Sequence, residues 1–60
     1  MRLLRKSINT CYKTLRYYGY IVDSYEPNTL EASMNNSGVC IKWVKLYFSP
    51  AGRCIKIEEH

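Results

Sequence analysis

Five basic side chains near the start of the chain are the groups best suited to do chemistry. Guanidinium and ammonium groups bind phosphate or carboxylate oxygens, and no Asp or Glu stands among residues 1–22 to neutralise them. On a helix with about 100° per residue, the five cations and Asn9 fall in one sector of roughly 100°. The pattern predicts a basic helix face that contacts nucleic acid or an acidic protein surface through Arg2, Arg5, Lys6, Lys13 and Arg16.

A second candidate set combines lysines with aromatic rings in the C-terminal half. In an extended strand Lys45 and Tyr47 lie on one face, and either Lys42 or Trp43 shares it. Rings between lysines can stack single-stranded bases while the charges follow the backbone. We favour the simpler interpretation that these rings pack at the rim of the core or against a second chain. The full set is Lys42, Trp43, Lys45, Tyr47 and Lys56.

Tyrosine is abundant enough to indicate a protein interface, where this residue is enriched. The chain has six tyrosines, and four of them cluster within residues 17–25. We expect most of these rings to be shared between the edge of the core and solvent. One or two of them would then be left for a partner.

The cysteines and the histidine do not have the spacing of a metal site. Cys11, Cys40, Cys54 and His60 include no close pair such as CxxC. The odd number of cysteines, and the lack of an apolar run long enough for a signal peptide or membrane span, indicate reduced thiols in a cytoplasmic protein. We therefore predict no metal, no disulfide and no cofactor, with the thiols packed as small apolar groups.

The sequence contains few residues that could form a catalytic site. His60 is the only histidine, and no Ser-His-Asp set or Gly-rich phosphate loop can be assembled. Glu58 and Glu59 are neighbours on an expected strand and point to opposite faces. We predict that the protein is not an enzyme.

The elements that must position these groups follow from the hydrophobic periodicity. A helix is expected up to Gly19, and Ser7 offers an alternative start that would leave residues 1–6 as a basic arm. Four extended segments follow, at residues 20–25, 29–34, 39–48 and 53–59. The sequence thus predicts one α+β domain over residues 1–60, in which an amphipathic N-terminal helix packs on one face of a four-stranded antiparallel meander.

The simplest strand pairing in the expected sheet does not give one continuous apolar face. If both long hairpins have two-residue loops, Glu31 stands opposite Lys42 and Lys45 stands opposite Lys56, a like-charge pair. The apolar sets of the two hairpins then lie on opposite faces of the strand over residues 39–48. A β-bulge near Lys42 and Trp43 restores one apolar face and is our preferred solution. The alternatives are a loop longer than two residues, or a sheet that coils enough to bury both of its faces.

With the bulge, one continuous apolar face of the sheet packs against the helix. The helix contributes Leu4, Ile8, Cys11 and Leu15 to this expected core. The sheet contributes Leu30, Ala32, Met34, Val39, Ile41, Val44, Leu46, Ile55 and Ile57.

Size and charge limit the functions open to the chain. A chain of 60 residues makes one small domain, near the lower limit for an unaided core. Of the net charge of +4, residues 1–22 contribute +5 and residues 23–60 contribute −1. The basic potential therefore belongs to the N-terminal element, and the chain is not an acidic mimic of nucleic acid.

Three functions are compatible with these features. The first is an accessory or regulatory protein that binds RNA or DNA through phosphate contacts. The second is a small inhibitor or adaptor that docks on a larger host or defence protein, steered by basic residues and anchored by tyrosines. The third is a homodimer whose open sheet face or edge strand pairs with itself. Binding to a membrane surface ranks last, because the apolar stripe is needed to cover the sheet.

Overall fold

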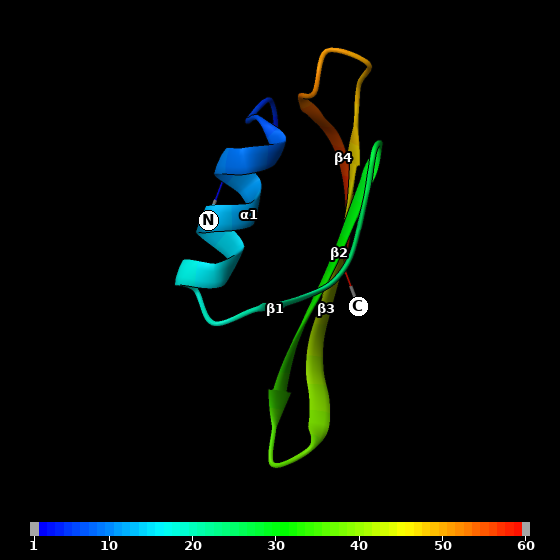
Figure 1. Ribbon diagram of the computed structural model, residues 1–60. Helices are drawn as coiled ribbons and strands as arrows, with labels where there is room; N and C mark the ends of the chain where they lie inside the picture. Colours follow the sequence, from blue (N-terminus) through cyan, green and yellow to red (C-terminus); the bar gives the residue numbers. More distant parts are fainter. Residues whose placement is uncertain (1, 60) are drawn as a thin grey trace.

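One helix and one antiparallel sheet make up the computed structural model, which describes residues 2–59. The helix α1 covers Ile8–Tyr17, and the strands are β1 (Ile21–Glu26), β2 (Thr29–Asn36), β3 (Val39–Phe48) and β4 (Cys54–Glu59). The strands lie side by side in the order β1-β2-β3-β4, and α1 lies against one face of the sheet (Figure 1). The predicted α+β meander is confirmed.

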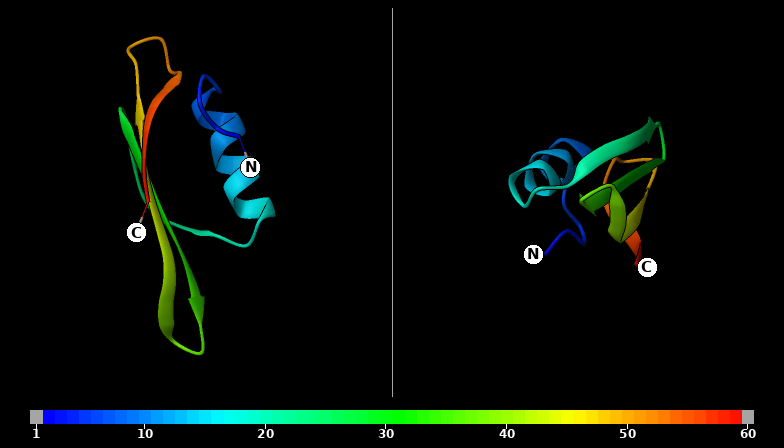
Figure 2. Two further views of the ribbon diagram at one scale, coloured as in Figure 1. Left: turned by 180° about the vertical axis from the view of Figure 1, so that it is seen from behind. Right: turned by 90° about the horizontal axis from the view of Figure 1, so that it is seen from below.

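The β2–β3 hairpin reaches beyond the rest of the fold. The molecule measures 37 × 17 × 15 Å, and the turn of this hairpin points away from α1 (Figure 1 and Figure 2, left). Pairing with β1 stops where Ile21 meets Ser33, and pairing with β4 stops where Val44 meets Glu59. Within the described residues, the end of the hairpin at 34–42 is therefore a two-stranded ribbon with two open edges.

The helix begins at the shorter alternative start. Ser7 is the N-cap residue, and its side-chain oxygen accepts a hydrogen bond of 3.2 Å from the backbone N–H of Thr10. Cations are disfavoured at the positive end of the helix dipole, and Ser7 supplies a cap directly after the last of them. The basic face on α1 itself is therefore reduced to Asn9, Lys13 and Arg16.

The segment before the helix is a fixed turn, so it is not a free arm. The N–H of Lys6 donates to the carbonyl oxygen of Leu3 over 3.1 Å. The N–H of Arg5 donates to the carbonyl oxygen of Cys54 over 2.8 Å, and the N–H of Cys54 donates to Lys6 over 2.9 Å. Arg5 adopts a φ of 69° to close this turn. These bonds cover the start of the outer edge of β4.

Leu3 enters the core in place of Leu4. The exposed fraction is 3% for Leu3 and 50% for Leu4. The prediction that Leu4 is a core residue is wrong because the helical wheel does not apply to residues 2–6. The turn reverses which of these two neighbours faces the sheet.

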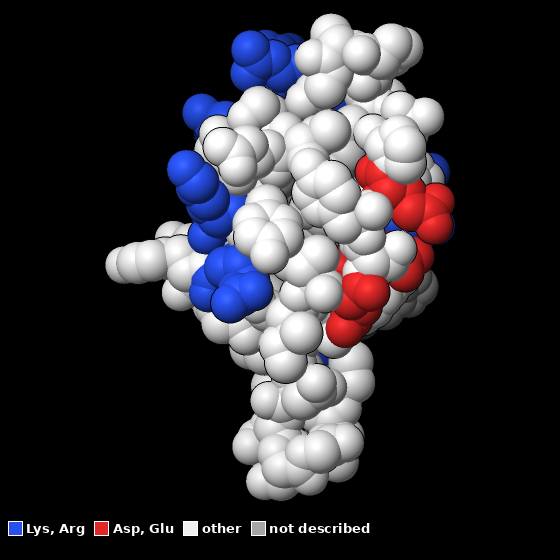
Figure 3. All heavy atoms as spheres, viewed as in Figure 1, with Lys and Arg blue, Asp and Glu red and all other residues white. Residues whose placement is uncertain are grey.

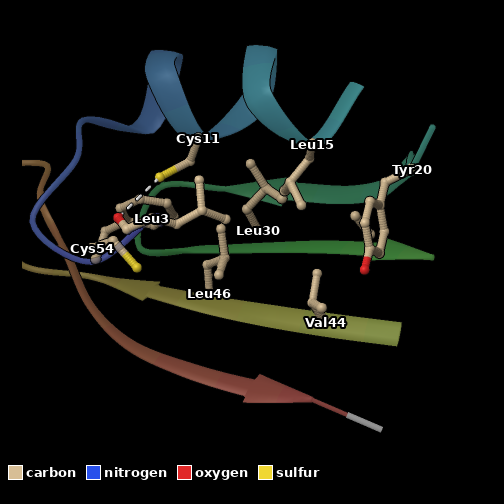
Figure 4. Packing of buried hydrophobic residues seen from close by; sticks show 10 residues of the cluster. Leu3, Cys11, Leu15, Tyr20, Leu30, Val44, Leu46 and Cys54 are labelled. Carbon is tan, nitrogen blue, oxygen red and sulfur yellow. Dashed lines mark hydrogen bonds between the residues drawn. The ribbon is translucent and has the colours of Figure 1, made fainter. Parts of the chain in front are cut away.

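The core lies between α1 and the middle of the sheet. Cys11 and Leu15 point from the helix toward Leu30, Leu46 and Val44 on the strands (Figure 4). The buried hydrophobic residues are Leu3, Cys11, Leu15, Tyr20, Leu30, Ala32, Val44, Leu46, Phe48 and Cys54. Most predicted core positions on α1, β2 and β3 are therefore correct, and the differences come from the N-terminal turn, the bulges and the protruding end of the β2–β3 hairpin.

A bulge in β3 shifts the register of the first long hairpin. Asn35 pairs with Cys40, whereas Met34 pairs with Lys42, so Ile41 is the extra residue. The predicted bulge is confirmed and lies one residue before its expected place. Ile41 is exposed as a result, contrary to the expected core.

A second bulge, which the sequence did not reveal, lies at Ile55 in β4. Phe48 pairs with Cys54 and Tyr47 pairs with Lys56, which leaves Ile55 without a partner in the ladder. Ile55 is exposed although it was expected in the core. Val39, beside the hairpin turn, is exposed because α1 does not extend over that end of the sheet (Figure 1).

The positions of the two hairpin turns, together with the two bulges, change the partners of the charged residues. Glu31 stands opposite Lys45 and not opposite Lys42, and Lys45 stands opposite Glu58 and not opposite Lys56. The predicted like-charge pair is therefore wrong. Lys45 lies instead between two carboxylates on the neighbouring strands, an arrangement that stabilises the sheet.

Candidate nucleic-acid interface

Lys13 and Arg16 lie on the solvent side of α1, away from the buried Cys11 and Leu15. They are three positions apart, so they are neighbours on the helix surface. Both are exposed, and neither forms an ion pair with another residue in the described part of the chain. Arg16 is in the last turn, where a cation suits the helix dipole.

Arg5 and Lys6 are exposed in the turn that precedes the helix, and the structure adds Arg53 beside them. Ser7 forms an antiparallel bridge with Arg53, which brings this third cation next to the turn. Sequence reasoning missed Arg53 because it belongs to the half of the chain with balanced charge. Only the pairing between the N-terminal segment and the start of β4 places it on the basic side.

Arg2 borders a shallow groove at the same end of the molecule. The groove has a volume of about 440 Å³, and Arg2, Leu3, Leu4, Arg5 and Ile57 line it. Arg2 thus stays near Arg5 without being helical. The five predicted cations are brought together over the turn and α1, although they do not form one helical stripe.

The acidic side chains and most of the basic side chains lie on different sides of the molecule, and Lys45 and Lys56 on the outer face of the sheet are exceptions. Lys and Arg gather on the side of α1, and Asp and Glu gather on the side of the sheet (Figure 3). The carboxylates are Asp23, Glu26, Glu31, Glu58 and Glu59, all of them on β1, β2 or β4. The separation leaves the positive potential of the helix side uncompensated by nearby carboxylates.

The outer face of the sheet holds a closed network around Tyr47. Lys45 Nζ lies 3.4 Å from Glu31 Oε1, and the Tyr47 hydroxyl donates to Glu58 Oε1. The ammonium groups of Lys45 and Lys56 lie 5.3 and 5.2 Å from the centre of the Tyr47 ring.

These contacts also shift proton affinities. The hydrogen bond to Glu31 raises the pKa of Lys45, and the hydrogen bond to Glu58 raises the pKa of Tyr47. The structure therefore brings Lys45, Tyr47 and Lys56 together. Their charges and the ring contact one another, so they do not form an open platform for bases.

Lys42 and Trp43 lie on opposite faces of the sheet. Trp43 shares the outer face with Lys45 and Tyr47 and stands opposite the buried Ser33. Lys42 lies on the helix side, where it borders a hollow of about 260 Å³ together with Tyr18, Tyr20 and Met34. Of the two alternatives, Trp43 is the one on the outer face.

The cysteines are separated into a buried pair and an exposed single residue. Cys11 and Cys54 are buried at the same end of the core (Figure 4), whereas Cys40 is exposed near the hairpin turn. Burial, followed by the neighbouring Cys54, raises the pKa of the Cys11 thiol to about 11. A thiol with so high a pKa is a poor nucleophile and metal ligand at neutral pH.

No metal-binding group of three or more Cys, His, Asp or Glu side chains occurs within residues 2–59, and His60 lies outside this range. No helix in the same range is long and apolar enough to cross a membrane. Comparisons with family models, with curated proteins and with solved structures found no match to this chain.

Proposed function

We propose that this protein is a non-catalytic accessory or regulatory module that binds RNA or DNA through phosphate contacts. The contacting side chains are Arg2, Arg5, Lys6, Lys13, Arg16 and Arg53. The observation that supports the proposal is their shared location on the helix side, exposed and remote from the carboxylates of the sheet (Figure 3).

The polarity of the helix surface between the cations favours nucleic acid over a protein partner. Asn9 and Thr10 are exposed beside Lys13, so this part of the helix surface is polar. Protein interfaces have an apolar centre inside a polar rim, whereas nucleic-acid interfaces are more polar and more positively charged. Each cation that neutralises a phosphate releases a counterion and so contributes to affinity.

Salt dependence of binding tests the proposal. Fluorescence anisotropy with labelled RNA and DNA oligonucleotides should show binding at low salt and its loss at moderate salt. If about four cations contact a single strand, log K should fall against log salt with a slope of about −3. Absence of salt-sensitive binding to either polymer would refute the proposal.

Two matched charge-reversal variants distinguish the effect of a cation on the helix side from the effect of net charge on binding. Lys13→Glu and Lys56→Glu both replace an exposed lysine, and both change the net charge by the same amount. We expect Lys13→Glu to weaken binding several-fold and to flatten the salt slope by about 1. Lys56→Glu, on the outer face of the sheet, should change binding little. Equal losses in both variants would indicate a nonspecific charge effect.

An alternative function is supported by the β2–β3 hairpin. Its end, residues 34–41, carries no charged residue, and the exposed fractions are 63% for Val39 and 52% for Ile41. An uncharged protruding hairpin suits an inhibitor or adaptor that inserts into a groove of a larger protein. This version predicts a stoichiometric complex that resists nuclease, survives Lys13→Glu and is lost when Val39 and Ile41 are both changed to Asp.

A further inference from the structure

The Tyr17 side chain lies almost entirely in solvent, although this small protein has few large apolar side chains to form its core. The exposed fraction is 84% for Tyr17 and 51% for the adjacent Tyr18. The two ring centres are 5.2 Å apart and the ring planes make an angle of 87°, an edge-to-face pair. Two large rings are thus held together in solvent at the C-terminal end of α1.

The backbone below these rings is fixed by the way the helix ends. The N–H of Gly19 donates to Arg16 over 3.1 Å, and the N–H of Tyr20 donates to Leu15 over 2.9 Å. This pair of bonds, with Gly19 at a φ of 93°, is a Schellman motif. Tyr20 is buried directly after it, so the chain is anchored on both sides of the exposed pair.

Cations surround the same end of the helix. Arg16 precedes Tyr17 in the sequence, and Lys13 is one turn before it on α1. Lys42 reaches this region from β3, because it shares the hollow of about 260 Å³ with Tyr18. We call Tyr17, Tyr18, Arg16 and Lys42 the tyrosine step.

We propose that the tyrosine step binds unpaired bases of a single-stranded nucleic acid by stacking, with Arg16 and Lys42 on the flanking phosphates. The proposal rests on the proposed nucleic-acid function and names the class of ligand for it. Exposed aromatic rings beside a basic track are the usual means of binding single strands, because every base has a face that can stack.

The contacts on the outer face of the sheet favour this location. On the outer face of the sheet, the Tyr47 ring already contacts Lys45 and Lys56, so the tyrosine step is the more open aromatic surface. The carbonyl end of α1 is negative and disfavours phosphate at the helix axis, so in this proposal the flanking cations must hold the phosphates. Bases in a duplex are stacked and paired internally, so they cannot reach the two rings.

The test uses three probes of equal length: a single strand, the same strand with abasic sites at its central positions, and the duplex. Each is prepared as RNA and as DNA, except that the abasic probe is DNA alone. We expect the wild-type protein to bind the intact single strand about tenfold more tightly than the abasic strand. Equal affinity for the intact and abasic strands would overturn the inference.

Three tyrosine variants assign the effect to the ring. Tyr17→Ala should weaken binding to the intact strand by about tenfold and leave binding to the abasic strand unchanged. Tyr17→Phe keeps the ring and should restore most of the affinity. Tyr25→Ala removes another exposed tyrosine, on β1, and serves as the matched control.

The outcomes distinguish the inference from the function on which it rests. Salt-sensitive binding that is the same for the intact and abasic strands, or insensitive to Tyr17→Ala, refutes the tyrosine step while the phosphate-binding function stands. Absence of salt-sensitive binding to every probe refutes both. Preference for the intact strand that depends on Tyr17, together with salt sensitivity, supports both.

Discussion

The backbone N–H of Arg5 donates to the carbonyl oxygen of Cys54 over 2.8 Å and so joins the start of the chain to the start of β4. Together with the bond from Cys54 back to Lys6, it makes the N-terminal turn part of the sheet edge. This junction brings Arg53 next to Arg5 and Lys6, and it turns Leu3 into the core.

Because the N-terminal turn buries Leu3 and exposes Leu4, we expect alanine substitutions at these two residues to have very different effects on stability. Leu3→Ala should lower the free energy of unfolding by about 2–4 kcal/mol, because it leaves a cavity in the core. Leu4→Ala should cost less than about 0.5 kcal/mol, because half of the Leu4 side chain is already in solvent. Urea denaturation followed by circular dichroism measures both. Similar losses in the two variants would contradict the observed turn.

Gly19→Ala should destabilise the fold through backbone conformation. A methyl group at Gly19 would meet Met34 Cε at 3.8 Å, an ordinary contact, so space is not the limitation. The φ of 93° is the cause, and we expect a loss of about 1 kcal/mol or more in the free energy of unfolding. Gly19→Asn should cost less, since asparagine tolerates positive φ. Equal costs for Ala and Asn would argue against the Schellman motif.

The cysteines should react in two groups. Under native conditions only Cys40 should be modified rapidly by a thiol reagent, because Cys11 and Cys54 are buried. All three should react in denaturant. Mass spectrometry of the native protein should therefore show one added label, and Cys40→Ser should show none on the same time scale. Rapid labelling of Cys11 without denaturant would contradict the packing at that end of the core.

Stability should fall as the pH rises above about 9. The pKa of Cys11 is raised from 9.0 to about 11 in the folded state, so the folded thiol holds its proton where the unfolded thiol loses it. The free energy of unfolding contributed by this group is thus complete below pH 9 and is lost between about pH 9 and 11. The raised pKa values of Tyr47 and Lys45 act in the same direction at higher pH.

Urea denaturation at pH 7, 8, 9 and 10 measures this dependence. Cys11→Ala should be less stable at every pH, because it removes a buried side chain, but its stability should decline less steeply above pH 9. Burial also raises the pKa of the Cys54 thiol, so Cys54→Ala and Tyr47→Phe provide the controls for other raised groups. An identical slope in the wild type and Cys11→Ala would show that Cys11 does not contribute.

Local patterns were enough to predict the elements and much of the core. The helical period stops at Gly19, and turn-forming residues separate the strands, so the order of one helix and four strands follows from neighbours in the sequence. Cys11, Leu15 and Leu30 were placed correctly for the same reason. The need for a bulge in β3 was also visible, because the alternation of apolar residues changes phase along that strand.

The partners of individual side chains were not predictable in this way. A change in turn position or a single bulge moves every later pair, and the bulge at Ile55 in β4 contributes in this way to Lys45 facing Glu58 in place of Lys56. The contact between Ser7 and Arg53 joins the two ends of the chain, and no local pattern signals it.

The sequence by itself determined the element order, the charge asymmetry and the clustering of tyrosines around the end of the helix and the first strand. Only the tertiary structure decided that Arg53 joins the basic side, that Tyr47 is enclosed by charges and that Tyr17 stays open. The physical reason is that propensity and periodicity act between near neighbours, whereas register and burial are set by packing between segments far apart in the chain.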